Sequence, residues 1–417
     1  MVLLYTLAIR LYGWGIFVAS FFSEKAKLWI EGRKNWEADL SAFNERFPFQ
    51  DGHQRIWVHC ASLGEFEQGR PLIEFIKSNA PNTIIILTFF SPSGYEIRKK
   101  YPHADGIFYL PLDSRSNAKR FLQLVKPDKV IFVKYEFWYH YLNALQQAKI
   151  PTIIISAIFR TEQIFFKTYG GFFRKILRSF DHLFVQDQSS IELLASININ
   201  NTTKAGDTRI DRVAQIPKEG KHFVKVAEFV GKAPCLVVGS SWSPDEAILK
   251  EALPTLPENW KVILAPHDIS EAHIAAIEKR WAGEVQRYSS LDDKSIDDAA
   301  IRILIIDNIG MLQSLYRYGR IAYIGGGFGA GIHNTLEPIT FGLPVIFGPK
   351  FQKFEEAKQL LQQGGGFTIS SAADLKDTLR LLLEPETYEV ASERALDYIH
   401  KNQGGTVKIA QYLGLKS

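Results

Sequence analysis

The chain has 417 residues, of which 46% are hydrophobic and 23% charged, and its formal net charge is +4. Its length exceeds the ~250–300 residues at which a single hydrophobic core stops growing, so two domains are expected. The charge is too small to predict nucleic-acid binding. The two cysteines lie far apart and without CxxC spacing, which argues against a disulfide framework or a zinc site and fits a reducing cytosol.

The first 22 residues, MVLLYTLAIRLYGWGIFVASFF, are apolar apart from Arg10 and small polar residues. They are just long enough to cross ~30 Å of hydrocarbon, although Arg10 is costly in a full span. Four basic residues follow them, Lys25, Lys27, Arg33 and Lys34, whereas a cleaved signal peptide carries its charge before the apolar core. Residues 1–34 are therefore expected to form an uncleaved anchor that spans once or lies in the interface, with basic residues on the cytoplasmic lipid surface. The alternative is a helix that only packs on the next domain.

Short apolar runs that alternate with helical patterns predict a parallel sheet in an N-terminal domain over residues 35–205. The expected strands are 55–60, 83–89, 107–110, 129–133, 152–156 and 182–185. Glu65 follows the first strand in a loop that opens a helix, and Glu136 follows the fourth, so both acids are expected at the edge where α/β proteins bind ligands. Two alternatives stay open. Glu65 could be a carboxylate that only caps its own helix, which the pattern alone favours, and Glu136 could be a buried partner of a lysine such as Lys134. His59 is interpreted as a structural histidine.

The polar stretch 206–233 is expected to connect the domains, and residues 234–417 are expected to form a second Rossmann-like domain. Its expected strands are 235–239, 261–265, 301–306, 321–324 and 344–347. Each strand runs into a polar loop, and such loops gather on one edge of a parallel sheet. C-terminal helices near 370–383 and 392–413 are expected to close the domain.

The stretch from Ile321 to Pro349 reads as a strand, a glycine loop, a short helix and a second strand. Glycine is needed where the backbone turns with positive φ or lies against a ligand. Asn334 is expected to cap the helix, so that Glu337 lies in the first turn, where a carboxylate accepts hydrogen bonds from a vicinal diol. A helix N-terminus also suits an anion, so the stretch predicts a nucleotide-sugar pocket. The residues expected beside its phosphates are Ser240, Ser241, Gly326 and Gly327. A tight βα turn without a ligand is the alternative.

Several motifs of the chain occur together in one family of enzymes. They include VHCASLGE (58–65), LTFFSPSGYE (87–96), EFW (136–138), AGDTRID (205–211), DNIGML (307–312), GGGFGAGIHNTLEP (325–338) and PVIFGPKFQKFEEA (344–357). The chain resembles the 3-deoxy-D-manno-octulosonic acid (Kdo) transferases of lipopolysaccharide synthesis, collinearly from Met1 to about Gln403. The S-x-G-E loop combined with HN-x-x-EP carries most of the specificity.

The resemblance implies an α/β protein with the GT-B glycosyltransferase fold, in which two Rossmann-like domains face each other across a cleft. The N-terminal domain would bind the acceptor and the C-terminal domain CMP-Kdo. The reaction would move Kdo to a lipid A precursor of the lipid IVA type at the cytoplasmic face of the inner membrane. No cofactor and no metal are expected, since no DxD-type acidic pair stands between the domains.

The resemblance also assigns roles to individual residues. Glu65 aligns with the general base, and Arg209 lies where the family usually has a lysine that stabilises the transition state. Glu136 is expected to be a third catalytic residue, together with Glu65 and Arg209. The segments that align with CMP-binding positions are Pro266–His267, Ile309–Gly310–Met311 and Asn334–Thr335–Leu336–Glu337.

This chain departs from the family pattern at four places. The family usually has P-R-H where this chain has Pro266, His267 and Asp268. Lys134 occupies the position of a family glutamate that is assigned to transition-state stabilisation, and Glu136 matches the next acid. Ile158 replaces a common arginine, with Arg160 close by, and Met311 replaces a frequent glutamate.

The implied chemistry needs a base for a sugar hydroxyl and stabilisation of a leaving phosphate. A single direct displacement would invert the anomeric centre. Two other functions remain open at this point: a nucleotide-sugar 2-epimerase on the same fold, and a catalytically inactive membrane-bound protein that binds a nucleotide or a lipid.

Overall fold

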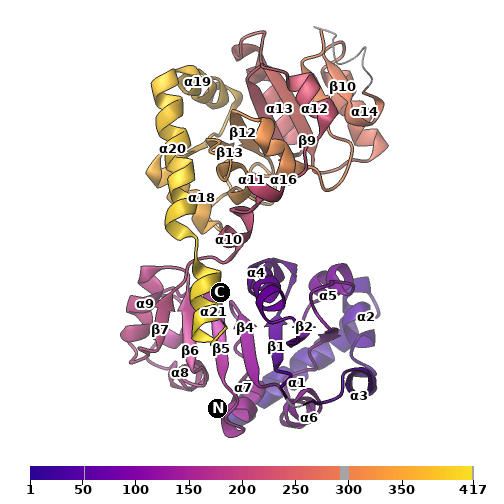
Figure 1. Ribbon diagram of the computed structural model, residues 1–417, viewed down its shortest axis with the longest axis vertical. Coiled ribbons are helices and arrows are strands. Elements are labelled where there is room, and N and C mark those ends of the chain that lie inside the picture. Colours follow the sequence, from indigo (N-terminus) through magenta and orange to yellow (C-terminus); the bar gives the residue numbers. More distant parts are fainter. Residues whose placement is uncertain (51, 292–299, 416–417) are drawn as a thin grey trace. The chain divides into compact units, whose positions relative to one another are not determined.

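The chain forms two compact units in the computed structural model, which describes residues 1–50, 52–291 and 300–415 (Figure 1). The first unit comprises Met1–Asp211 and Asn402–Ser417, and the second comprises Arg212–Lys401. The chain passes between them in α10 (Arg209–Val213) and α20 (Pro385–Asn402). The C-terminal boundary differs from the expected one, because the last helix, α21 (Gly405–Tyr412), belongs to the first unit. Its buried Ile409 and Ala410 join the core formed by residues of β1 and α4.

A seven-stranded parallel sheet forms the centre of the first unit, in the order β3-β2-β1-β4-β5-β6-β7. The strands are β1 Arg55–Cys60, β2 Ile84–Phe89, β3 Gly106–Tyr109, β4 Lys129–Val133, β5 Thr152–Ala157, β6 His182–Val185 and β7 Thr202–Lys204. The helices are α1 Val2–Ala19, α2 Glu24–Glu31, α3 Trp36–Arg46, α4 Leu63–Asn79, α5 Pro92–Arg98, α6 Arg115–Val125, α7 Tyr139–Gln147, α8 Gly171–Leu177 and α9 Gln188–Ala195, with a 3₁₀ turn at Ile164–Phe166. All six residues of β1 are buried, as a parallel strand covered on both faces requires. Trp57 packs into the core on one face, while Ile56 and Val58 pack into the core on the other.

The second unit repeats this plan with a seven-stranded parallel sheet in the order β10-β11-β9-β8-β12-β13-β14. The strands are β8 Cys235–Ser241, β9 Lys261–Pro266, β10 Val285–Arg287, β11 Ile303–Ile305, β12 Ile321–Ile324, β13 Val345–Phe347 and β14 Gly366–Thr368. The helices are α11 Ile216–Glu219, α12 Val224–Val230, α13 Ser243–Ala252, α14 Glu271–Arg280, α16 Leu312–Leu315, α17 Leu336–Ile339, α18 Glu355–Gln363 and α19 Ala372–Leu383, with 3₁₀ turns at Leu253–Thr255, Tyr288–Ser290 and Tyr316–Tyr318. The eleven expected strands are all present, with ends that shift by up to two residues. The edge strands β7, β10 and β14 were not predicted.

Both sheets have a point at which the direction of strand succession reverses. In the first unit this point lies between β1 and β4, and in the second it lies between β8 and β12. Ligands of open α/β sheets bind outside the carboxyl ends of the strands at such a point, because the two loops there diverge and leave a crevice. The residues that follow β1, β4, β8 and β12 are therefore the first place to look for a site.

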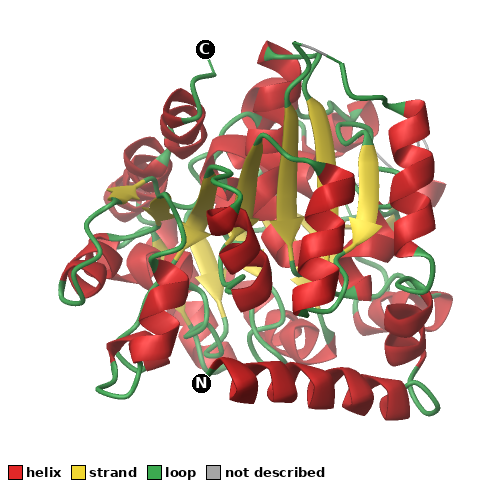
Figure 2. Ribbon diagram, turned by 90° about the horizontal axis from the view of Figure 1, so that it is seen from below, coloured by secondary structure: helices red, strands yellow, loops and turns green. Residues whose placement is uncertain are grey.

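Helix α1 lies along one side of the first unit and contacts it through polar groups (Figure 2). The Tyr5 hydroxyl donates to Asp113 at 2.6 Å, and Thr6 Oγ1 lies 2.9 Å from Nε2 of His140. Apart from the exposed Arg10, most of the remaining surface of the helix is apolar and exposed, including Leu3, Leu4, Leu7, Leu11 and Trp14 at 54–86% exposure. By length and composition alone α1 could cross a membrane, with a mean hydropathy of 1.6.

One of the four basic residues expected at a lipid surface is turned inward. The Arg33 guanidinium donates to the backbone oxygens of Trp29, Phe90 and Leu110, and lies 3.7 Å from the centre of the Trp29 ring. Burial lowers the pKa of Arg33 to about 9. The expectation for Arg33 was therefore wrong, because three carbonyl groups and an aromatic face replace the water around its charge. Lys25, Lys27 and Lys34 are exposed or half-buried.

Candidate active site

Glu65 lies at the switch point of the first unit, in the first turn of α4. The helix begins at Leu63, earlier than expected, so Glu65 is a helical residue and not part of a loop. Its Oε2 accepts hydrogen bonds from the Ser62 backbone N–H at 2.8 Å and from the Ser62 hydroxyl at 3.1 Å, which completes a capping box. Burial and the negative charge of Glu136 raise the pKa of Glu65, against the opposing effect of the Ser62 hydrogen bonds. The carboxylate therefore caps its helix and is also tuned toward a stronger base.

Glu136 is buried after β4 and is held by two donors. Its Oε2 lies 2.9 Å from Nε2 of His59 and 2.5 Å from Nε1 of Trp138. The other nitrogen of His59 lies 2.8 Å from the Thr88 hydroxyl, which itself accepts a hydrogen bond from the indole of Trp57 at 2.8 Å. Because an indole only donates and a carboxylate only accepts, a neutral His59 ring would donate from Nε2–H to Glu136 and accept at Nδ1 from the Thr88 hydroxyl. The structure thus shows His59 as a partner of Glu136, where the sequence suggested a lysine such as Lys134.

Arg209, expected to stabilise the transition state, forms an ion pair with its neighbour Asp207. Its Nε and Nη2 donate to Asp207 Oδ2 at 2.9 and 2.6 Å, and Gln68 donates to the same oxygen at 3.1 Å. Burial opposes ionisation of Asp207, but the Arg209 charge outweighs it and holds the pKa of that carboxyl below its ordinary value. This pair lies in the first unit, where α10 begins.

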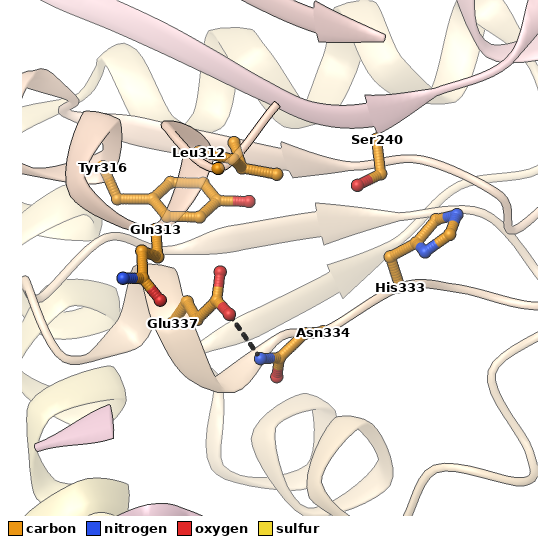
Figure 3. Close-up of a pocket in the computed structure, with 8 residues that line it drawn as sticks. Ser240, Leu312, Gln313, Tyr316, His333, Asn334 and Glu337 are labelled. Carbon is orange, nitrogen blue, oxygen red and sulfur yellow. Dashed lines mark hydrogen bonds between the residues drawn. The ribbon is translucent and has the colours of Figure 1, made fainter. Parts of the chain in front are cut away.

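A cavity of about 360 Å³ occupies the switch point of the second unit (Figure 3). Its volume falls within the range of small-molecule sites. The lining residues are Ser240, Gly310, Leu312, Gln313, Tyr316, His333, Asn334 and Glu337. Ser240 and His333 lie at one end, and Gln313, Tyr316 and Glu337 at the other. Ser240 has a φ of 54°, a left-handed conformation that a serine adopts only when its surroundings impose it.

The HNTLE segment divides between cavity and core. Helix α17 begins one residue later than expected, because its N-cap residue is Thr335 and not Asn334. Asn334 Oδ1 accepts the Leu336 N–H at 3.0 Å from the position before the cap, and its side-chain amide donates to Glu337 at 3.0 Å. These two residues line the cavity, whereas Thr335 and Leu336 are buried beside it at 1% exposure. The Thr335 hydroxyl has no hydrogen-bond partner in the described part of the chain. Asn334 and Glu337 therefore line the cavity, whereas Thr335 and Leu336 are packed beside it.

The residues expected beside the phosphates are mostly engaged within the protein. The Gly326 N–H donates to the buried Asp245 at 3.0 Å, and the Ser241 hydroxyl donates to Glu246 at 3.1 Å. Gly327 packs against the backbone of Gly348, where an added Cβ would come within 2.6 Å. Of the four, only Ser240 lines the cavity. The Gly326 N–H is thus already engaged within the protein, while the phosphate role expected of Gly327 and Ser240 stays a prediction.

The two other expected CMP-binding segments lie around the same strand ends. Gly310 lines the cavity, Ile309 is 87% exposed, and Met311 is buried beneath it. Pro266 is the last residue of β9, and the exposed His267 follows it.

Four residues of this region were missed as site residues: Leu312, Gln313, Tyr316 and His333. The first three come from the turn and short helix after β11, and their sequence gave no polar motif to single them out. His333 was visible next to Asn334, but its position on the cavity wall depends on the fold of the glycine loop. Among the described residues, no group of three or more His, Cys, Asp or Glu side chains is placed to hold a metal ion.

Comparison with solved structures supports the architecture. The chain is similar to UDP-GlcNAc 2-epimerase from Neisseria meningitidis bound to UDP-GlcNAc, with a TM-score of 0.61 and 15% identity over 87% of this chain and 100% of that one. It is also similar to Acinetobacter baumannii MurG, with a TM-score of 0.56 and 14% identity over 87% and 99%. At these identities the likeness concerns the fold alone, which is the α/β GT-B fold.

Comparison of sequences identifies the family. Residues 37–212 match the model described as 3-deoxy-D-manno-octulosonic-acid transferase (kdotransferase). The 3-deoxy-D-manno-octulosonic acid transferase of Aquifex aeolicus is 30% identical over 335 residues, which cover 79% of this chain and 86% of the Aquifex protein. The Rickettsia bellii transferase of the same name is 27% identical over 88% of this chain and 90% of its own length. The chain is therefore a glycosyltransferase that belongs to the 3-deoxy-D-manno-octulosonic acid transferase family.

Proposed function

We propose that this protein transfers Kdo from CMP-Kdo to a lipid A precursor of the lipid IVA type, with inversion at the anomeric carbon and with Glu65 as the general base. The observation that carries the proposal is that each unit has functional groups at its own switch point. Glu65 follows β1 in the first unit, and a cavity of about 360 Å³ lies between β8 and β12 in the second. The family membership indicates that Kdo is the transferred sugar. We infer that the site at Glu65 in the first unit binds the acceptor and that the cavity of the second unit binds the donor.

The cavity of the second unit suits the cytidylate part of the donor. Glu337 and Asn334 present an acceptor and an amide that can hydrogen-bond to a ribose diol or to the base edge. Gln313 and Ser240 add further donors and acceptors on the wall. Leaving-group charge develops on the phosphate as the bond to the Kdo anomeric carbon breaks, so donors directed at that phosphate lower the barrier.

The first unit suits the acceptor. A sugar hydroxyl is too weakly acidic to attack unaided, and a carboxylate of raised pKa within hydrogen-bond reach accepts its proton as the new bond forms. A second cavity of about 550 Å³ lies after β5 and is lined by Phe159 and Arg160 among other residues. Arg160 supplies a positive charge there, which favours the phosphates that a lipid A precursor carries. The negative charge of Glu136, which is held by His59 and Trp138, raises the pKa of Glu65 and makes it a stronger base.

Helix α1 supports action at the membrane surface. Tyr5 and Thr6 hold one side of the helix against the protein through polar contacts. A helix that spanned the bilayer would lose these contacts. Its exposed leucines and Trp14, followed by the basic residues Lys25 and Lys27, fit an interfacial helix on an anionic leaflet. We therefore place the protein on the cytoplasmic face of the inner membrane, where a lipid-linked acceptor is accessible to Glu65.

The test is incubation of the purified protein with CMP-Kdo and a tetra-acylated lipid A precursor, followed by mass spectrometry of the lipid. The expected product gains the mass of one or more Kdo residues, and CMP is released in equal amount. Turnover of a UDP-sugar to its 2-epimer without Kdo transfer would favour the epimerase alternative. Binding of CMP without any product would favour the inactive nucleotide-binding alternative.

A further inference from the structure

A further cavity of the second unit lies at the opposite edge of the sheet from the proposed donor cavity. Its volume is about 520 Å³, which falls within the range of small-molecule sites. Its lining includes Cys235, where β8 begins, Trp260, which leads into β9, and Arg320, which leads into β12. The donor cavity lies at the carboxyl ends of β8 and β12. This second hollow, called the amino-edge cavity below, has no part in the proposed function.

Two positive charges line the amino-edge cavity, and its described lining residues include no acid. Lys232 lies three residues before β8, and Arg320 directly precedes β12, the strand that pairs with β8. The Arg320 N–H donates to the Cys235 carbonyl at 2.7 Å, which holds the two segments side by side. Within the described ranges, neither the Lys232 ammonium nor the Arg320 guanidinium forms an ion pair with a carboxylate. Glu384 and Glu386, the acids nearest in sequence to this lining, are exposed and do not line the cavity.

Three aromatic residues, Trp260, Tyr318 and Tyr388, share the wall with these cations. The Arg320 guanidinium lies 3.8 Å from the centre of the Tyr388 ring. Such stacking covers one face of a guanidinium and leaves its in-plane N–H groups available, which is the geometry that binds a phosphate with two parallel hydrogen bonds. The Tyr318 hydroxyl accepts the Phe223 N–H at 2.8 Å and donates to the Phe223 carbonyl at 3.3 Å. The Tyr318 ring is therefore fixed in place and offers its face, not its hydroxyl, to a ligand.

The buried part of the lining supplies no negative charge to balance the two cations. Cys235 is 1% exposed, and burial raises the pKa of its thiol to about 12, so the thiol stays neutral near pH 7. Trp260, at 4% exposure, adds an apolar surface. The stack of Arg320 on Tyr388 would by itself tie α20 to the sheet, but such a tie needs neither Lys232 nor a cavity of this volume. An anion is therefore the ligand that the charges of this wall favour.

We propose that the amino-edge cavity binds a nucleoside monophosphate, with its phosphate held by Lys232 and Arg320 and its base against the aromatic wall. A phosphate dianion matches the two cations in charge, and a planar base stacks on aromatic side chains whatever its identity. A free phosphate would leave the aromatic wall unused, and an uncharged ring would leave both cations unpaired. The inference goes beyond the proposed function and does not depend on it, because the two cavities lie at opposite edges of the sheet.

The test is calorimetric titration of the full-length protein with AMP at about pH 7.5, where its phosphate carries close to two negative charges. AMP is expected to bind with a dissociation constant below ~1 mM, and adenosine or inorganic phosphate alone should bind at least ~10-fold more weakly. Arg320→Gln and Lys232→Gln should each weaken AMP binding by about 10–100-fold, the effect of losing a hydrogen bond to a charged group. The matched controls, Arg394→Gln on α20 and Lys279→Gln on α14, change exposed cations of the same unit and should bind AMP as the unchanged protein does.

Asn334→Ala, in the donor cavity, distinguishes the two sites, because it should leave AMP binding unchanged. Loss of AMP binding in Asn334→Ala, together with full binding in Arg320→Gln, would place AMP in the donor cavity and overturn the proposal. Absence of AMP binding to the unchanged protein, or equal binding of inorganic phosphate, would overturn it as well. Melting curves show whether each variant is folded, and Lys232→Gln, at an exposed side chain, decides the test if Arg320→Gln does not fold. A protein that transfers Kdo but does not bind AMP keeps the proposed function and loses only this site.

Discussion

Replacement of Glu65 separates its structural role as a helix cap from its proposed catalytic role as the general base. The carboxylate accepts two hydrogen bonds from Ser62 at 2.8 and 3.1 Å, and it is also the proposed base. Glu65→Gln keeps a side-chain oxygen that can accept the Ser62 N–H, since glutamine also serves in a capping box. Its stability cost should therefore stay well below ~1 kcal/mol. Glu65→Ala removes both bonds and should cost about 1 kcal/mol, or roughly 2–4 °C in the melting temperature of a unit of this size.

The effect on catalysis is expected to be larger and equal in the two variants. Loss of a general base lowers the rate by about 10²–10⁴-fold, which corresponds to about 2.7–5.4 kcal/mol of activation free energy. The amide of glutamine cannot accept the proton of the attacking hydroxyl, so Glu65→Gln should lose its transfer rate even though it keeps the helix cap. The two variants should thus differ in stability but not in rate.

The assay is initial-rate Kdo transfer with saturating CMP-Kdo, next to thermal melting of the same preparations. Glu67→Gln is the matched control, because Glu67 lies on the same helix and pairs with Arg98 at 2.7 Å. A Glu65→Gln variant that keeps more than about a tenth of the activity would refute the reasoning and leave the residue as a helix cap.

Three further predictions concern Glu136, helix α1 and the glycine loop. Glu136→Gln removes a charge that raises the pKa of Glu65, so the acidic limb of the kcat/KM profile should move to lower pH; an unmoved limb would contradict the coupling. Trp14→Glu changes a side chain that is 68% exposed on α1. It should lower the affinity for anionic vesicles about tenfold in a sedimentation assay, a loss of ~1.4 kcal/mol in binding free energy. An unchanged affinity would argue against an interfacial α1. Gly325→Ala places a Cβ 2.2 Å from a backbone oxygen and should cost about 1–3 kcal/mol in the free energy of unfolding, whereas Gly329→Ala, with its nearest atom at 3.5 Å, should cost less in the same denaturant titration.

Much of the fold follows from local sequence. The strands at the centre of the two sheets are largely apolar, because a strand that is covered by helices on both faces is buried at nearly every position. The short strands β7, β10 and β14 lack such runs and lie at or next to a sheet edge, where pairing with one neighbour determines them. The assignment of α21 to the first unit also needed the tertiary structure, since its apolar face matches either domain in sequence.

For the site, the sequence by itself determined where the central strands end, and hence that Glu65, Glu136, Ser240, Asn334 and Glu337 would lie at the carboxyl edges of the two sheets. Only the tertiary structure decided how their hydrogen bonds are used. Capping of α4 by Glu65 is local, but the pairing of Glu136 with His59 and the capture of the Gly326 N–H by Asp245 join residues about 80 positions apart. A strand pattern records which side chains reach an edge, whereas the partner of each polar group depends on which strands become neighbours, and that is a property of the folded sheet.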